Sequence, residues 1–208
     1  MAMARPREQT ARRREIVEAA GRAIVERGVL GLRVKDVAAE AGISPGLVSY
    51  YFPDLDDLLV DLHEHSVDRF YWDRMSLVEG VGSAPEQLRA LVASGIPEKA
   101  DDELLVALYE LHLHAARNRT HAALMTSLWD REVSVYAMVL QEGEARGELT
   151  LNAPAADIAS TAVALEDAFG LHIIARNRRL DSARGRGLLL GYLSRATGSD
   201  LGHDGARD

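Results

Sequence analysis

The 208-residue chain has no cysteine and few aromatic residues, which make up 5% of it. Without cysteine there is no disulfide, no thiolate nucleophile and no cysteine-ligated zinc, as fits a reducing compartment. No apolar run approaches the roughly 18 residues of a membrane span, and no apolar stretch follows the N-terminal arginines to form a signal peptide. We therefore expect a cytoplasmic protein that has no membrane partner.

Regular alternation of apolar and polar residues is also almost missing, so few segments could form a half-buried β-strand. Apolar residues recur instead at helical spacing, between residues that cap or break helices. These signals predict an all-α fold of about nine helices, three in the first fifty residues and a larger bundle after them. The predicted helices span about residues 8–27, 34–41, 45–52, 55–79, 85–94, 101–117, 121–145, 154–174 and 182–196.

Acidic residues outnumber basic ones by 32 to 24, but the charge is unevenly distributed. Residues 1–52 hold nine basic and six acidic residues, whereas the rest of the chain is strongly acidic. A basic N-terminal quarter on an acidic body suits a protein that meets a polyanion at one end only. Solvated arginine-rich tails are common, so charge alone is a weak indication of nucleic-acid binding.

The predicted helices 34–41 and 45–52 form a helix-turn-helix pattern, in which the second helix enters the major groove of DNA. Gly42 lies in the connection, and Ser44 followed by Pro45 is typical of a helix start. An ordinary helical hairpin inside a bundle is the alternative. The basic N-terminus and the two adjacent tyrosines before Pro53 favour DNA binding.

The free face of the second helix carries groups that suit DNA. Hydroxyls can bond phosphates, Gly46 permits close approach, and Leu47 can lie against a thymine methyl. Val48 and Phe52, on the opposite face, are expected to be buried supports. The expected organisation is a DNA-binding domain over 1–53 with a basic arm over 1–14, a ligand-binding and dimerisation domain over 54–198, and a disordered tail over 199–208.

The stretch from Ile16 to Leu59, which contains E-R-G-V-L-G-L-R-V-K-D-V-A-A-E-A-G-I-S-P-G-L-V-S-Y-Y-F-P-D-L-D-D-L-L, resembles the DNA-binding domain of the TetR family of transcriptional regulators. G-L-V-S-x-Y-F resembles the branch that includes the choline-responsive repressor of the betaine pathway, and L-E-D-A-F-G-L-H near the C-terminus resembles it loosely. The resemblance implies a homodimeric repressor that binds a palindromic double-stranded DNA operator and is released by a small-molecule inducer. A ligand-independent or activating regulator is the alternative.

Two positions depart from the family pattern. Leu55 stands where the family usually has lysine, and Leu32-Arg33 stands where it usually has a capping threonine. Arg33 can still reach a phosphate, and Lys35 matches the position that often reaches a base. The predicted DNA-binding residues are Arg33, Lys35, Ser44, Pro45, Gly46, Leu47, Ser49, Tyr50 and Tyr51. Arg5, Arg7 and Arg12 to Arg14 are expected to add nonspecific affinity, because each neutralised phosphate releases counterions.

The family architecture implies a ligand pocket among the predicted helices from residue 55 to residue 174. Its candidate lining residues are Leu62, Ser66, Phe70, Tyr109, His112, Trp129, Tyr136, Glu166 and Phe169, together with Asp167. Glu166 and Asp167 interrupt an apolar run, where a charge must be paired or meet a cation. Two possibilities are open: a cationic ligand framed by aromatic rings, or an acidic pair bonded to Arg or Tyr of a neighbouring helix.

Catalysis is not expected. The pairs His63/His65 and His112/His114 point apart on their helices, because only residues spaced by three or four share a face. No motif for a metalloprotease, a phosphate-binding loop, a dinucleotide site or a serine nucleophile is present. We therefore predict no cofactor and no metal, with His63 and Glu64 solvated. A helical scaffold that does not bind DNA is a further alternative.

The last two predicted helices are expected to form a homodimer interface. Helix 154–174 carries small residues that allow close approach, and helix 182–196 carries an apolar band too broad for a peripheral helix. The predicted interface residues are Ala159, Val163, Leu188, Leu189, Tyr192 and Leu193. Pairing these helices with their copies would make a two-fold four-helix interface. The alternative is that the band completes the core of the single chain.

Overall fold

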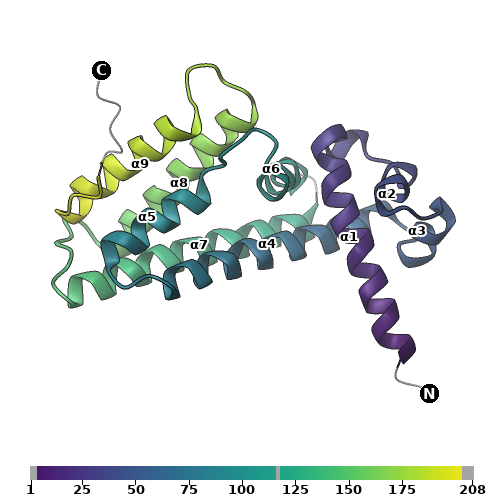
Figure 1. Ribbon diagram of the computed structural model, residues 1–208, viewed down its shortest axis with the longest axis horizontal. Coiled ribbons are helices and arrows are strands. Elements are labelled where there is room, and N and C mark those ends of the chain that lie inside the picture. Colours follow the sequence, from purple (N-terminus) through teal and green to yellow (C-terminus); the bar gives the residue numbers. More distant parts are fainter. Residues whose placement is uncertain (1–3, 116–117, 203–208) are drawn as a thin grey trace. The chain divides into compact units, whose positions relative to one another are not determined.

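The computed structural model describes residues 4–115 and 118–202, with side chains from residue 8 onward, and this part contains nine helices and no strand (Figure 1). The helices are α1 (Ala4–Gly31), α2 (Val34–Ala41), α3 (Pro45–Tyr51), α4 (Leu55–Glu79), α5 (Ala84–Gly95), α6 (Glu103–Ala115), α7 (Arg119–Ala145), α8 (Ala155–Ile174) and α9 (Ser182–Thr197). The all-α prediction is confirmed. None of the described helices is both long enough and apolar enough to cross a membrane.

Local signals set the ends of α2 and α3 where the sequence predicted them. Gly42 ends α2 in the left-handed region at φ 65°, where a side chain would be strained. The hydroxyl of Ser44 accepts a hydrogen bond from the Leu47 N–H at 3.3 Å, and Pro45 occupies the first helical position. Phe52 closes α3 by donating its N–H to the carbonyl of Val48 at 2.9 Å.

The predicted end of the first helix at residue 27 coincides with a kink inside α1. Gly28 has φ 65° and ψ 163°, so the helix breaks there before one more turn reaches Gly31. That turn is held from α6, because the Val29 N–H donates to a Glu110 carboxylate oxygen at 2.9 Å. The local break was therefore predictable, and the continuation depends on a partner 81 residues away.

The described chain divides into two compact units. Among the described residues, unit 1 contains 4–69, 101–115 and 118–125, and unit 2 contains 70–100 and 126–202. Helices α4 and α7 belong partly to each unit. This division differs from a boundary after residue 53, and the assignment of DNA binding to 1–53 and of ligand binding to 54–198 remains a prediction.

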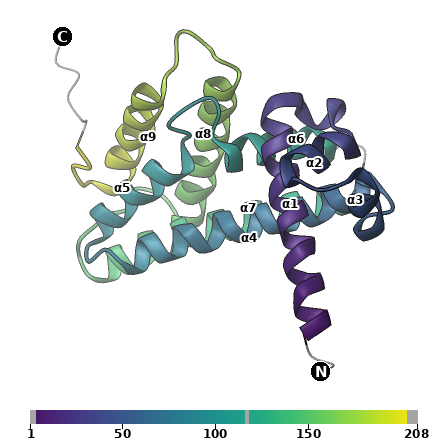
Figure 2. The same ribbon diagram turned by 45° about the vertical axis from the view of Figure 1, so that its right-hand side comes forward.

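Unit 1 is built around α1, which packs against both α2 and α6, while α2 packs against α3 (Figures 1 and 2). Its buried core combines α1 residues such as Ile16 and Ile24 with Val37, Val48 and Phe52. The helix-turn-helix is therefore fixed by apolar contacts to α1, as its large interhelical angle requires.

Unit 2 contains α5, α8 and α9 packed against one another. Of the predicted disordered tail, Leu201 packs in the core of this unit, Asp200 and Gly202 are exposed, and residues 203–208 lie outside the described residues. Leu201 is fully buried, its N–H donates to the Ser194 hydroxyl at 3.2 Å, and its carbonyl accepts from Arg89 at 3.4 Å. Burial of the Leu201 side chain therefore holds the polar segment that follows α9 against the core of unit 2.

Candidate nucleic-acid interface and buried polar clusters

Helix α3 presents one face to solvent and the other to the core of unit 1. Val48 is fully buried and Phe52 is 2% exposed, as expected for supports of the helix. Tyr50 is 70% exposed, while Tyr51 is half-buried and meets it edge to face at 5.3 Å between ring centroids. The remaining exposed residues among those predicted in or beside α3 are Ser44, Pro45, Gly46, Leu47 and Ser49.

Helix α2 exposes both of its predicted DNA contacts, Arg33 and Lys35. Asp36 supplies the reciprocal bond of a helix cap, since its carboxylate accepts the N–H of Arg33, the residue before the helix, at 3.1 Å. Asp36 also pairs with Arg27 at 3.3 Å. Since Asp36 stabilises the first turn, the side chains of Arg33 and Lys35 stay available to meet a phosphate or a base.

Arg13 has a structural position that the sequence did not indicate. Its Nε lies 2.7 Å from the Asp61 carboxylate, and it donates to the Tyr51 carbonyl at 3.1 Å. Its guanidinium carbon also stands 4.1 Å from the Phe52 ring centroid. Arg13 thus braces the end of α3 against α1 and α4, and the expectation that it adds nonspecific affinity for DNA stays a prediction.

The other arginines of the predicted basic arm differ from Arg13. Arg12 pairs with Glu15 at 2.6 Å and Arg14 with Glu18 at 3.0 Å, both on the exposed surface of α1. Such pairs within one helix are weak and can exchange for a phosphate. The side chains of Arg5 and Arg7 lie outside the described residues.

Unit 2 contains a buried group of charged residues, here called the Arg74 cluster: Arg74, Glu132, Tyr136 and Glu166. The Arg74 guanidinium meets both Glu166 oxygens, at 3.1 and 3.2 Å, and the Tyr136 hydroxyl donates to Glu166 at 2.5 Å. The Arg74 side chain is 1% exposed and that of Glu166 is 2% exposed. Of the two possibilities for Glu166, the structure therefore has the carboxylate bonded to an arginine and a tyrosine.

The Arg74 cluster still has more carboxyl groups than cations. Glu132 is buried with Arg74 at 4.0 Å, although Arg74 already pairs with Glu166. Burial raises the pKa of Glu132 well above its usual value, and Arg74 opposes this only in part. Beside the cluster, burial raises the pKa of Asp167 to about 6, with a further contribution from Glu166. A cation beside these carboxyl groups would lower their pKa and favour their ionised forms.

Gly95 of α5 makes room for the Arg74 cluster. A Cβ atom at this position would collide with the Glu166 carboxylate and with the Arg74 guanidinium. The ion pair therefore lies directly against the backbone of α5, where any larger residue would displace it. Phe70 and Tyr136 add aromatic faces, with ring centroids 5.0 and 5.4 Å from the Arg74 guanidinium carbon.

The remaining predicted ligand residues divide between the two units. Leu62, Ser66, Tyr109 and His112 belong to unit 1, and Phe70, Trp129, Tyr136, Glu166 and Phe169 belong to unit 2. Trp129 is 38% exposed. Phe169 packs toward α9, since its Cβ lies 3.4 Å from where a Cβ of Gly185 would be.

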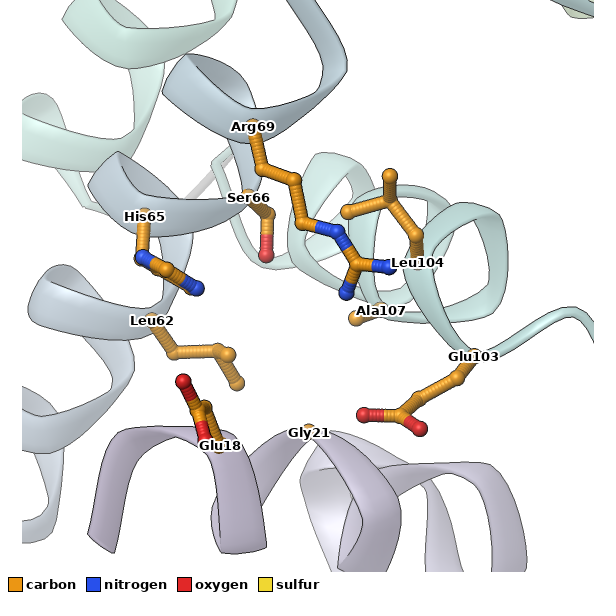
Figure 3. A pocket seen from close by; sticks show the side chains of 9 residues that line it. All are labelled: Glu18, Gly21, Leu62, His65, Ser66, Arg69, Glu103, Leu104 and Ala107. Atoms are coloured by element: carbon orange, nitrogen blue, oxygen red, sulfur yellow. The ribbon is translucent and has the colours of Figure 1, made fainter. Parts of the chain in front are cut away.

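Leu62 and Ser66 line a small pocket of unit 1 between α1, α4 and α6 (Figure 3). Glu18, Arg69 and Glu103 contribute charged side chains around it (Figure 3). The cavity measures about 20 Å³, which is room for a single water molecule. In this conformation the pocket is too small for an organic ligand.

The histidines of unit 1 gather although their spacing on single helices suggested otherwise. His63 is fully buried, so the prediction that it is solvated is wrong, whereas Glu64 is exposed as expected. The Nδ1 atoms of His63 and His121 are 2.9 Å apart, and the rings of His63 and His112 are 6.5 Å apart. His114 stands edge to face with His121 at 4.9 Å.

Four of the predicted dimer residues, Ala159, Val163, Leu189 and Leu193, are fully buried in the core of unit 2 within the single chain. They cannot face a second copy, so this part of the prediction is corrected in favour of the alternative. The apolar band of α9 faces two ways. Leu188 is 42% exposed and Tyr192 is half-buried, and on α8 Leu171 is 48% exposed.

Sequence reasoning missed Arg74 and Glu132, although helical spacing could have indicated both. Arg74 continues the series Leu62, Ser66 and Phe70 by four residues along one face of α4. Glu132 lies four residues before Tyr136 on α7. Arg74 and Glu132 each share a helix face with a predicted ligand residue. An arginine on one such face and a glutamate on the other indicate an internal ion pair.

Comparison with known proteins agrees with these features. Residues 16–62 match the family described as bacterial regulatory proteins, tetR family. The HTH-type transcriptional regulator BetI of Brucella canis is 29% identical over 163 residues, covering 78% of this chain and 78% of that protein.

Two solved structures share the fold. A regulator from Saccharomonospora viridis in complex with choline has a TM-score of 0.82 at 23% identity, covering 90% of this chain and 98% of that chain. A protein from Rhodococcus sp. described as a TetR-family transcriptional regulator has a TM-score of 0.74 at 29% identity, covering 89% and 98%. All of these relatives are regulators and not enzymes. Residues 16–62 of the chain therefore carry the N-terminal helix-turn-helix domain of the TetR family of bacterial transcriptional regulators, and the relatives that cover most of the chain's length support a TetR-family regulator.

Proposed function

We propose that the protein is a homodimeric repressor that binds a palindromic operator through α2 and α3 and is released by a cationic small molecule. The observation that carries the proposal is the outward face of α3. Its small, hydroxyl and aromatic side chains are exposed, while Val48 and Phe52 hold the helix from behind. A helix braced in this way can enter a major groove without losing core contacts.

Lys35 is the proposed base contact, since it is exposed on α2 and matches the family position. Lys35→Ala should weaken binding to an operator selected from randomised duplexes by about 1–3 kcal/mol and change random DNA much less. Fluorescence anisotropy on both duplexes measures this difference. Lys99→Ala is the matched control, because Lys99 is exposed outside the helix-turn-helix. An equal loss on both duplexes would exclude a base contact.

Phosphate contacts are assigned to Arg14 and Arg33, which are exposed. Arg14→Ala should weaken operator and random DNA alike and reduce the salt dependence of binding, because one fewer counterion is released. Arg13 is unsuitable for this test, since its loss would disturb the end of α3. A change confined to the operator would contradict the assignment of Arg14.

The proposed inducer is a small cation of the choline type that binds in unit 2. Glu132 and Asp167 give the surroundings of Arg74 an excess of carboxyl groups, and the rings of Phe70 and Tyr136 supply faces that attract cations. The choline bound to the S. viridis regulator of the same fold supports this class of ligand.

Titration of the protein–operator complex with choline tests the ligand class. Choline should release the operator, and its uncharged carbon isostere should not. Glu132→Gln should blunt the response to choline while operator binding stays near that of the wild type. Glu142→Gln, at an exposed position of the same helix, is the control. If the isostere releases the operator as well as choline does, charge is not what the site recognises.

The proposed dimer surface is the outward side of α8 and α9. It combines Leu171, Leu188 and Tyr192 with the exposed small residues Ala164 and Ala168. Leu188→Glu should yield a folded monomer with reduced operator affinity, as sedimentation and anisotropy would show together. A variant that stays dimeric and binds the operator normally would remove α9 from the interface. In vitro transcription from the operator separates repression from activation.

A further inference from the structure

Asp56, His114 and His121 meet in unit 1 from three different helices. Asp56 lies in the first turn of α4, His114 in the last turn of α6 and His121 in the first turn of α7. One potential ligand atom from each residue lies within 4.8 Å of the other two. We propose that these three residues bind one divalent transition-metal ion, for which Zn²⁺ fits the donors best.

The distances are close to those of a coordination sphere. Ligand atoms held about 2.0–2.2 Å from a tetrahedral Zn²⁺ stand roughly 3.3–3.6 Å apart. His114 Nε2 and the Asp56 Oδ1 atom are already 3.3 Å apart. These two ligands need almost no movement, and an approach of His121 completes a site with one open position.

The two imidazoles and one carboxylate select the type of ion. Mg²⁺ and Ca²⁺ prefer oxygen donors alone, whereas imidazole suits Zn²⁺ and its first-row neighbours. A ligating histidine nitrogen must be free to bind the ion. Within the described residues, the Nε2 atom of His121 is buried without a hydrogen-bond partner.

Neighbouring side chains orient the three ligands. Asn118 donates to the second oxygen of Asp56 at 2.8 Å, which leaves Oδ1 directed at His114. His63, fully buried, holds His121 through the contact of 2.9 Å between their Nδ1 atoms. Partners of this kind fix the direction of ligands in metal sites and are part of their affinity.

A bound ion would join the first turn of α4 to the ends of α6 and α7. Residues 52–54 alone separate α3 from α4, so the ion would also fix the base of the recognition helix. This inference does not depend on the proposed operator or inducer, because it concerns an ion bound by the free protein.

The test uses the full chain freed of metal with a chelator and titrated with Co²⁺. A single Co²⁺ per chain should give the intense visible absorption of a tetrahedral site, and Zn²⁺ should displace it. His114→Gln and Asp56→Asn should each weaken binding at least 10-fold and lose that absorption. Both positions are partly exposed, so these variants are expected to fold. Circular dichroism verifies the fold.

Two further variants make the assignment specific. His63→Gln should keep the tetrahedral absorption and weaken binding about 10- to 100-fold, as expected for a positioning residue. His172→Gln, at an exposed histidine of α8, should bind Co²⁺ as the wild type does. A wild type that shows only the pale octahedral spectrum, or that binds no more tightly than His114→Gln, overturns the proposal. Equal weakening by His172→Gln does so as well.

Discussion

The two units differ in the charge of their buried polar side chains: those of unit 1 are neutral, and those of unit 2 include charged groups. In unit 1 the buried rings of His63 and His112 are neutral at pH 7, because burial lowers their pKa values to about 3 and about 4. In unit 2 a charged guanidinium, Arg74, is buried with Glu166 and Glu132. A neutral buried ring can leave one nitrogen without a hydrogen-bond partner at a moderate cost in stability. A buried ion pair that loses one partner leaves an uncompensated charge, which is strongly destabilising.

This contrast suggests a division of roles. The charges of unit 2 can answer a charged ligand, since any added cation or anion changes their balance. The neutral histidines of unit 1 can answer a proton or a metal ion, since each would compete for the same ring nitrogens. The following four predictions test the contrast, beginning with the largest expected effect.

Arg74→Met should lower the free energy of unfolding by about 3–5 kcal/mol, because it leaves the Glu166 carboxylate buried without its cation. Urea unfolding followed by circular dichroism measures the change. Arg14→Ala, which removes an exposed pair with Glu18, should alter stability far less. The double variant Arg74→Met with Glu166→Leu should regain part of the loss. If Arg74→Met is as mild as Arg14→Ala, the buried pair is not a structural requirement.

Gly95→Ala should destabilise the protein by about 1–3 kcal/mol, because the new methyl group would displace the Arg74–Glu166 pair from the backbone of α5. The matched control is Gly46→Ala, since Gly46 is also helical and has open space around it. Gly46→Ala should keep or slightly raise stability, by up to about 1 kcal/mol. Thermal unfolding of the two variants compares them directly, and equal melting temperatures would contradict the crowding at Gly95.

Acid should weaken unit 1 through its histidines. Burial, with smaller contributions from His121, His112 and His114, lowers the pKa of His63 from 6.5 to about 3. Below pH 6.5 the unfolded chain therefore takes up a proton that the folded chain excludes. The resulting stability is present above pH 6.5 and is lost as the pH falls toward the folded pKa.

The free energy of unfolding of the wild type should fall between pH 7.5 and pH 5. In His63→Leu this fall should be smaller by about 1–2 kcal/mol. The comparison uses the pH dependence of each protein, so a change in stability at pH 7.5 does not affect it. His172→Leu, at an exposed position, should show the wild-type dependence. Identical pH dependence in His63→Leu and the wild type would show that the pKa of His63 is the same in the folded and unfolded chains, and would contradict the lowered pKa.

Asp167 should act in the opposite direction. Burial raises its pKa from 3.8 to about 6, so the folded chain keeps a proton that the unfolded chain has lost. Its contribution favours folding at low pH and is lost as the pH rises through 6. Asp167→Asn should therefore stabilise the protein at pH 7.5, with a gain that shrinks toward pH 4. Urea unfolding at the two pH values tests this, and a gain that grows toward pH 4 would contradict the assignment.

Much of the fold was predictable because local signals fix helix ends. Ser44, Pro45 and Gly42 define the turn between α2 and α3 through caps and backbone conformations that neighbouring residues determine. The exposed face of α3 was equally predictable, since 3.6-residue periodicity separates Val48 and Phe52 from the residues that face solvent. The recognition surface therefore depends on short-range information.

Four of the six predicted dimer residues were wrong, because periodicity does not say which partner covers an apolar face. The apolar residues of α9 were correctly identified as a broad band, yet Leu189 and Leu193 pack in their own unit while Leu188 faces solvent. Composition shows that such a band must be covered. It does not say whether the same chain or a second copy covers it.

The sequence by itself determined the helices, their caps and the outward face of α3, because these follow from interactions within about four residues. Only the tertiary structure decided which polar side chains meet. It joined Arg74 to Glu166 across 92 residues and His63 to His121 across 58. Two residues that are two positions apart on one helix cannot both ligate the same metal ion. Three helices packed together can each contribute one ligand to it. Long-range packing chooses those partners, and no local pattern records that choice.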